Sequence, residues 1–327
     1  MFQTDFYILF DHIKVQSANA ISGPLSYGFP ALTGLTGAMH ALNRKLTHHP
    51  VQFGGVMVAC HDYELQTYQN SAFSDRTFKQ TRNPIKRNGE TASIIEEGKI
   101  HLDLSLVVEV HVQDDRVFEA LTDKTSQASQ DFLQTCKNLL WQQRIAGGSV
   151  LEIGNVQLFN LEEDQDIPLA LMPAFVLMDA KQELANITEE LKTGLRIGQL
   201  DEEGNVQKSC LPSCPDATAL DALLEMATVH HIPEHANATA SAWQTYSVKK
   251  GRGWLVPLPV GYQAISPLFA PGQLQHCRTQ QYPSQYVETL YSLGKWVFPL
   301  SLPENLSQCF WRYTALQNNL YLISQGE

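Results

Sequence analysis

The sequence lacks the marks of membrane and secreted proteins. Across 327 residues, no apolar run approaches the ~20 residues that span a bilayer. The first residues, "MFQTDFYILFDHIKV", have neither the basic start nor the small-residue cleavage site of a signal peptide. The six cysteines are scattered, and they would form disulfides only in an oxidising compartment. We therefore expect a cytoplasmic protein with free thiols and no contact with a membrane.

Motifs for catalysis and metal binding are also missing. The sequence contains no Walker P-loop, no G-x-S-x-G and no H-E-x-x-H. Cys210 and Cys214 lie close together in "CLPSC", but no second ligand pair follows at a zinc-finger spacing. His40 and His61 are the best candidates for acid–base chemistry, although such histidines are more often structural hydrogen-bond partners. We expect no catalytic residue, no metal and no cofactor.

The net charge of −11 is unevenly distributed. Residues 101–239 contain 23 acidic and eight basic residues, whereas residues 1–100 and 240–327 are slightly basic. The two ends of the chain can therefore bind a polyanion while the acidic middle faces elsewhere. The overall acidity does not exclude a nucleic-acid partner.

One short segment concentrates positive charge. "RTFKQTRNPIKR", residues 76–87, contains five basic residues and no acidic one. Pro84 and the following "RNG" are turn signals, so the segment is typical of a projecting hairpin. Arg and Lys there suit phosphate groups, and Phe78 suits stacking on a base. The alternative is an ordinary solvated loop.

Hydrophobic periodicity predicts an α+β fold in the first half of the chain. Apolar residues recur at helical or alternating spacing in an order typical of a ferredoxin-like (RRM-like) domain, which many RNA-binding proteins use. The expected elements are a strand at 6–16, a helix at 31–46, strands at 51–65 and 100–112, a helix at about 116–145 that ends at Gly147 and Gly148, and a strand at 149–159. Gly34 and Gly37 in the first helix suggest close approach of another segment.

The second half of the chain has weaker patterns. We expect a strand at 168–179, a helix at 216–231, a loose connector at 235–245, edge strands and loops at 253–272, and a helix at 284–299. The inward face of the helix at 216–231 is expected to consist of Leu220, Leu223, Leu224 and Ala227. The C-terminal half is therefore expected to be irregular.

Four blocks of sequence resemble a known family. They are "NAISGPLSYGFPALTGLTGAMHALNRKL", "TRNPIKRNGETASIIEEGKIHLDLSL", "RIAGGSVL" and "GWLVPLPVGYQAISPLFAPG". In this order they resemble the second subunits of the Csy complex, the type I-F CRISPR surveillance complex. That family belongs to a wider group of CRISPR RNA-binding proteins with ferredoxin-like domains.

The resemblance implies a non-catalytic role. Such a subunit binds the 5′ end of the CRISPR RNA, pairs with the large subunit and abuts the first backbone subunit. It meets target DNA only indirectly through the complex, and a different protein cuts the RNA. The resemblance further implies an RNA-binding domain at 1–160 with a thumb-like hairpin at about 73–98. Residues 161–327 would be an acidic middle and a Pro/Gly-rich part that completes the fold.

The resemblance and the local charge together give a set of expected RNA-binding residues. This set is Asn19, Ser22, Arg76, Lys79, Arg82, Asn83, Arg87, Gly147, Gly148, Ser149, Arg252 and Trp254. Arg76 and Lys79 are included on charge alone. Gly147 and Gly148 can either admit the RNA backbone or only end a helix, and Trp254 can instead be a buried core residue.

Two other functions remain open at the level of sequence. The first is an endoribonuclease that processes precursor CRISPR RNA, with His40 or His61 in an acid–base pair. The second is a protein-interaction subunit whose contact with RNA is incidental.

Overall fold

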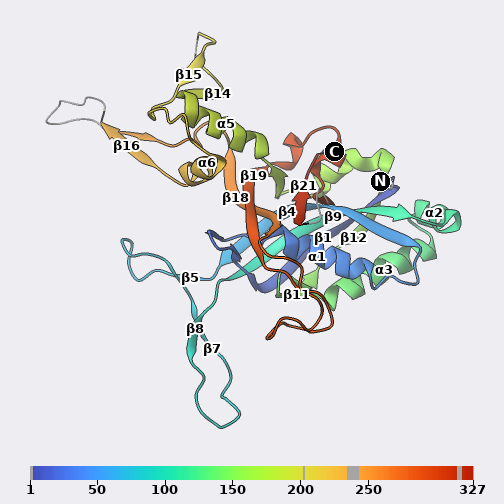
Figure 1. Ribbon diagram of the computed structural model, residues 1–327. Helices are drawn as coiled ribbons and strands as arrows, with labels where there is room; N and C mark the ends of the chain where they lie inside the picture. Colours follow the sequence, from blue (N-terminus) through green and yellow to red (C-terminus); the bar gives the residue numbers. More distant parts are fainter. Residues whose placement is uncertain (1–2, 202, 234–242, 315–318, 327) are drawn as a thin grey trace. The chain divides into compact units, whose positions relative to one another are not determined.

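The computed structural model of the protein describes residues 3–201, 203–233, 243–314 and 319–326. The chain divides into two compact units (Figure 1). The first unit comprises Met1–Val176, Pro259–Leu290 and Phe298–Glu327, and the second comprises Leu177–Leu258 and Tyr291–Val297. None of the helices in the described ranges is long and apolar enough to span a bilayer.

An antiparallel sheet organises the first unit. The part of this sheet formed by residues 6–179 has the strand order β10–β11–β1–β9–β4–β13, and β12 pairs with β1 beyond the end of β11. The bounds are β1 Phe6–Asn19, β4 Val51–Leu65, β9 Lys99–Val112, β10 Arg144–Ile145, β11 Gly148–Ile153, β12 Val156–Asn160 and β13 Phe175–Asp179. β9 is central, so residues 104–111 are buried on both faces rather than on one. The segment 149–159, expected as one strand, forms two strands, β11 and β12.

The three longer helices of the same unit, among the described residues, are α1 Leu32–Asn43, α2 Asp115–Thr122 and α3 Gln127–Trp141. α1 packs on β4, α3 packs on β11 and β12, and the two helices contact each other. The apolar residues that predict the first helix repeat at three and four positions and are all buried: Leu32, Leu35, Met39, Leu42 and Leu46. The prediction of one helix at 116–145 is wrong. The chain turns at Asp123, and the Ser126 hydroxyl caps a new helix by accepting from the Ser129 N–H.

The elements later in the chain also differ from expectation. The predicted helix at 284–299 is wrong, since Val287–Val297 is strand β19, which lies beside β18 (Trp254–Ala264). Its Val, Thr, Tyr and Trp residues favour a pleated strand. The predicted strand at 168–179 begins only at Phe175. The remaining short elements are η1 Leu161–Asp166, α4 Ile167–Ala170, η2 Pro299–Ser301, η3 Leu306–Cys309, β20 Arg312–Thr314 and β21 Leu320–Ser324.

Two turn-rich insertions extend from this sheet. Between β4 and β9 the chain forms β5 (Thr67–Tyr68) with β6 (Thr77–Phe78), and then β7 (Gln80–Arg82) with β8 (Ile94–Glu96). After β1 it forms a short pair, β2 (Ile21–Gly23) with β3 (Ser26–Tyr27). The β7–β8 hairpin runs away from the ends of β4 and β9 (Figure 1).

The second unit has its own small core. Its elements are α5 Lys181–Thr193, β14 Leu195–Leu200, β15 Val206–Lys208, α6 Ala219–Met226, β16 His230–Pro233 and β17 Trp243–Tyr246. The core gathers Ile187 and Leu191 of α5 with Leu223 and Met226 of α6. The prediction of the inward face of α6 is correct only for Leu223, which is buried. The other three residues, Leu220, Leu224 and Ala227, are exposed. Most of the expected connector at 235–245 lies outside the described residues.

A buried carboxylate links the elements of the second unit. Glu190 of α5 accepts hydrogen bonds from the Tyr246 hydroxyl, from the Ser209 hydroxyl at 2.8 Å and from Arg252 Nη2 at 2.9 Å. Burial alone would raise the Glu190 pKa, but these donors overcome it and hold the pKa below its ordinary value. The carboxylate is therefore ionised and stabilises the unit as an anion.

Candidate nucleic-acid interface

The basic segment forms the first strand and the tip of the β7–β8 hairpin. Arg82 pairs with Ile94 at the last position of the ladder, and residues 83–93 form the tip. Within the tip, the Lys86 N–H donates to the Glu90 carbonyl and the Gly89 N–H donates to the Lys86 carbonyl, each at 2.9 Å. Gly89 has a φ of +84°, a conformation that glycine adopts without a Cβ clash. The tip is thus an ordered turn that holds Arg87 at its outer end.

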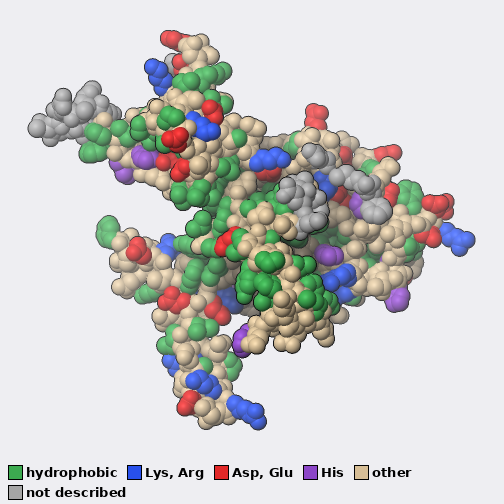
Figure 2. Space-filling model, in the orientation of Figure 1, with side chains coloured by type: hydrophobic (Ala, Val, Ile, Leu, Met, Phe, Trp, Pro, Cys, Tyr) green, Lys and Arg blue, Asp and Glu red, His purple; other side chains and the backbone are tan. Residues whose placement is uncertain are grey.

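Two arginines on this hairpin are unengaged. Arg82 and Arg87 are exposed, and neither has a hydrogen-bond or ion-pair partner among the described residues. Lys86 lies 3.5 Å from Glu90, but both side chains are more than half exposed, so the pair is weak. Figure 2 shows Lys and Arg side chains along the hairpin at the lower left. Free guanidinium groups on a projecting turn are suited to bind phosphates.

The other two basic residues of the segment lie nearer the base of the hairpin. Lys79 Nζ donates to Gln66 Oε1 at 2.7 Å, and Arg76 Nη1 donates to Thr67 Oγ1 at 3.4 Å. These bonds use neutral acceptors, so the charges stay unpaired. Asn83 is exposed beside Arg82. Basic side chains therefore occur from the base of the hairpin region to its tip.

The 19–28 turn packs against the base of the hairpin. The Tyr27 and Phe78 rings meet edge to face with their centroids 5.3 Å apart, and the Ala20 N–H donates to the Gly98 carbonyl at 2.9 Å. A Cβ at Gly98 would lie 2.6 Å from Ile21 Cγ1, so a larger residue there would displace the Ile21 side chain. The 19–28 turn and the base of the hairpin, which lie far apart in the sequence, are thus in contact.

Asn19 and Ser22 stabilise this turn. Asn19 Oδ1 accepts from the Ile21 N–H and Asn19 Nδ2 donates to the Ile21 carbonyl, both at 3.0 Å. The Ser22 hydroxyl lies 2.9 Å from the Ser26 hydroxyl. Their side chains thus shape the turn, and the exposed Asn19 amide keeps hydrogen-bonding capacity for a ligand.

Gly147, Gly148 and Ser149 lie in the β10–β11 hairpin, which is not a helix end. α3 ends at Trp141, so the expectation that these glycines terminate the helix is wrong. A Cβ at Gly148 would lie 2.7 Å from the Ala18 backbone nitrogen, which shows that β1 and β11 need this glycine for packing. The hairpin meets the other segments, because the Asn19 N–H donates to the Ala146 carbonyl at 2.8 Å. Ala146 also lies 3.0 Å from the Cβ position of Gly34, which explains that glycine.

Arg252 and Trp254 lie in the second unit. Arg252 is only 3% exposed, and its guanidinium binds Glu190 and lies 3.2 Å from Glu183. It has almost no surface to offer a phosphate. Trp254 is half-exposed, and its ring centroid lies 6.3 Å from that of Trp296.

Exposed aromatic rings near the hairpin were not singled out in the sequence. Tyr27, Tyr63 and Tyr68 are each more than half exposed, and Phe73, in the loop from β5 to β6, is fully exposed. Exposed aromatic rings combined with basic side chains are common where proteins stack unpaired bases. The sequence places an aromatic residue in a turn-rich, charged segment, which could have pointed to Phe73. It does not show whether the ring is exposed.

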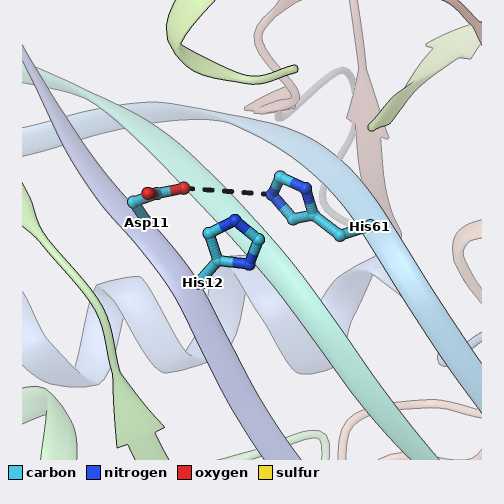
Figure 3. Close-up of side chains that lie close together, drawn as sticks. All are labelled: Asp11, His12 and His61. Carbon is cyan, nitrogen blue, oxygen red and sulfur yellow. Dashed lines mark ion pairs between the residues drawn. The ribbon is translucent and has the colours of Figure 1, made fainter. Parts of the chain in front are cut away.

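His40 and His61 have different surroundings. His40 is exposed on α1, with no acid–base partner among the described side chains. His61 is nearly buried and lies against Asp11 and His12 (Figure 3). Its Nε2 also lies 2.7 Å from the Ser105 hydroxyl. Of the two, only His61 has the carboxylate and second imidazole that an acid–base centre needs. The exposed Cys210 and Cys214 are free thiols.

The chain is similar to CRISPR-associated proteins over nearly its whole length. A family model described as CRISPR-associated protein (Cas_Csy2) matches residues 8–323. The CRISPR-associated protein Csy2 of Pseudomonas aeruginosa (strain UCBPP-PA14) is 32% identical over 330 aligned residues, which cover 94% of this chain and 91% of that protein. The similarity therefore includes both units and the hairpin.

Proposed function

The chain belongs to the Csy2 family of CRISPR-associated proteins, and on this premise we propose that it is a non-catalytic, RNA-binding subunit of a type I-F Csy complex. In this role it binds the 5′ end of the CRISPR RNA, pairs with the large subunit and adjoins the first backbone subunit. Target DNA is met through the assembled complex.

The observation that carries the proposal is the pair of unengaged guanidinium groups, Arg82 and Arg87, on an ordered hairpin. Charge-assisted bonds from arginine to phosphate need such free donors. Phe73 and Tyr68 nearby in the chain add stacking surface. Asn19 and Ser149, both exposed, lie where the 19–28 turn and the β10–β11 hairpin meet, and they suit contacts with sugar hydroxyls or base edges.

The sheet supports a ferredoxin-like assignment for residues 1–160. The order β11–β1–β9–β4, with α1 and α3 in contact with each other and with these strands, is the arrangement that a ferredoxin-like domain requires. The hairpin at about 73–98 then corresponds to the thumb of this domain. The acidic middle, with Leu220 and Leu224 exposed on α6, offers surface to a protein partner rather than to RNA.

A binding experiment tests end recognition. The protein, co-purified with its large-subunit partner, is mixed with CRISPR repeat RNA that has a free 5′ end, and with the same RNA extended upstream. We expect tighter binding of the RNA with the free end and intact RNA on a denaturing gel. Equal affinity for both RNAs would contradict end binding.

The endoribonuclease remains the second candidate because His61 contacts Asp11 and His12. Precursor RNA that is shortened by the purified protein, but not by a His61→Ala variant, would favour it. A protein that binds its large partner equally well without RNA, and does so unchanged after Arg82 and Arg87 substitutions, would favour the incidental-contact alternative.

A further inference from the structure

Two β-bulges face each other across the central strand of the sheet. In β1 the pairing with β9 shifts between Phe10 and Ile13, whose partners are Leu106 and Leu104, so two residues of β1 oppose Ser105 alone. In β4 the pairing with β9 shifts between Cys60 and Asp62, where His61 is the extra residue. Bulges redirect side chains and are common beside functional sites.

The bulges bring three polar side chains together. Consecutive residues of a regular strand point to opposite faces. In β1, however, His12 has a φ of +47°, and Asp11 and His12 both reach toward His61 (Figure 3). The Asp11 carboxylate and one ring nitrogen of each histidine lie within 4.8 Å of one another. Asp11 Oδ1 is 3.9 Å from His61 Nε2, and the imidazole centroids are 4.0 Å apart.

The outward nitrogen of each imidazole is already held. His12 Nδ1 lies 3.0 and 3.1 Å from the two carboxylate oxygens of Asp103, and His61 Nδ1 lies 2.9 Å from the Pro173 carbonyl. The carboxylate and the carbonyl can only accept, so Nδ1 of each ring has the hydrogen, and each Nε2 offers a lone pair to an ion when its ring is neutral. A metal-binding histidine typically has this arrangement, in which an acceptor on one nitrogen orients the other toward the ion.

We propose that Asp11, His12 and His61 form a binding site for one divalent transition-metal ion, best matched by Zn²⁺. Two imidazoles and one carboxylate are the donor set of many three-ligand zinc sites, whereas Mg²⁺ and Ca²⁺ prefer oxygen ligands. Ion entry is possible, because the His12 side chain is 43% exposed and the Asp11 side chain is 22% exposed. The bound ion links β1 to β4 across β9 and uses no residue of the proposed RNA interface.

The Ser105 hydroxyl competes with an ion for two of the three ligand atoms. Its hydroxyl lies 2.7 Å from His61 Nε2 and 2.8 Å from Asp11 Oδ1. A bound ion replaces the hydroxyl as the partner of both atoms, and the hydroxyl retains the bond from the His12 backbone N–H at 3.1 Å. The hydroxyl therefore keeps one partner when the ion binds.

The test is a zinc titration of the full chain after chelator treatment, followed by calorimetry. We expect one Zn²⁺ per chain, a loss of affinity of more than about 100-fold in His12→Asn and His61→Gln, and a loss of about tenfold in Asp103→Asn, which removes only the orienting carboxylate. Asparagine is chosen at position 12 because it tolerates a left-handed backbone. His40→Ala, on an exposed helical face, is the matched control and should bind zinc like wild type.

A second measurement does not depend on whether the variants fold. X-ray absorption of the zinc-loaded wild-type protein should show two imidazole nitrogens at about 2.0 Å and no sulfur ligand. Sulfur ligation, or zinc uptake lost only in Cys210→Ser with Cys214→Ser, would overturn the proposal. Failure of the wild-type chain to bind zinc at micromolar concentration would overturn it as well.

Discussion

The Tyr27 ring meets the Phe78 ring edge to face, with centroids 5.3 Å apart and planes at 88°, and this contact joins the 19–28 turn to the base of the hairpin. The two segments are about 50 residues apart in the chain. The contact therefore brings two separate blocks of the sequence, the turn and the base of the hairpin, next to each other.

Phe78→Ala should loosen the hairpin base. Edge-to-face aromatic pairs contribute ~0.5–1.5 kcal/mol beyond buried area, so amides of β6 and β7 should exchange roughly two- to tenfold faster. Hydrogen exchange measured by mass spectrometry checks this, with Phe73→Ala, a ring with no buried surface, as the control. Unchanged exchange in Phe78→Ala would show that the ring pair does not hold the hairpin.

Phe73→Ala should weaken RNA binding without a cost in stability. A base stacked on an aromatic ring contributes ~1–3 kcal/mol, and the Phe73 ring is fully exposed, so its removal leaves no cavity. The dissociation constant should rise roughly five- to 150-fold at all salt concentrations. Tyr282→Ala, another exposed ring outside the hairpin, is the control. Wild-type affinity in Phe73→Ala would remove this ring from the interface.

Gly148→Ala should destabilise the first unit. The added methyl group would lie 2.7 Å from the Ala18 nitrogen and from Val15 Cγ1, and overpacking of this kind costs ~1–3 kcal/mol. Gly147→Ala meets no atom within 4 Å, so its cost comes only from the φ of +80°. Denaturant unfolding compares the two. A stable Gly148→Ala protein that has lost RNA binding would instead assign the glycine to RNA approach.

Glu190→Gln should destabilise the second unit at neutral pH and make its stability depend less on pH in the acidic range. Hydrogen bonds from Tyr246, Ser209 and Arg252 depress the Glu190 pKa below its ordinary 4.5, despite burial. A depressed carboxyl pKa contributes stability above the unfolded-state pKa and loses it as pH falls through the folded-state pKa. At pH 7, breaking this buried pair should cost ~3–5 kcal/mol.

Unfolding curves between pH 7 and pH 3 check this prediction. Wild type should lose stability below about pH 4.5, the ordinary carboxyl pKa, and the variant should lose less over the same range. Glu189→Gln, an exposed neighbour on α5, is the control. Parallel pH curves for wild type and Glu190→Gln would contradict the role of the buried anion.

Much of the first unit could be predicted because its periodicity is strong. The alternation at 100–112 and the three-and-four spacing from Leu32 to Leu46 correctly gave β9 and α1. Segments with mixed signals were missed. Val287–Val297 contains apolar residues at both helical and alternating spacing, and its pairing with β18 makes it a strand. The sequence alone does not show that the two segments pair.

The candidate sites show the same limit. The charge run identified Arg82 and Arg87 as surface residues, because charged turns rarely lie inside a protein. Arg252 carries the same charge but is buried against Glu190, which lies 62 positions away. The His12–His61 contact depends on two bulges in strands far apart in the chain. A local sequence pattern cannot predict contacts between residues so far apart in the chain.

The salt dependence of RNA binding in an Arg82→Ala, Arg87→Ala double variant tests the central claim most directly. The complex with the large subunit is titrated with 5′-labelled repeat RNA over a salt series, beside an Arg116→Ala, Lys208→Ala control that removes two exposed charges elsewhere. Each phosphate contact contributes about 0.7 to the slope of log affinity against log salt for single strands. We predict weaker binding, a slope lower by about 1.4 and an unchanged control. Wild-type affinity and slope in the hairpin variant would contradict the account.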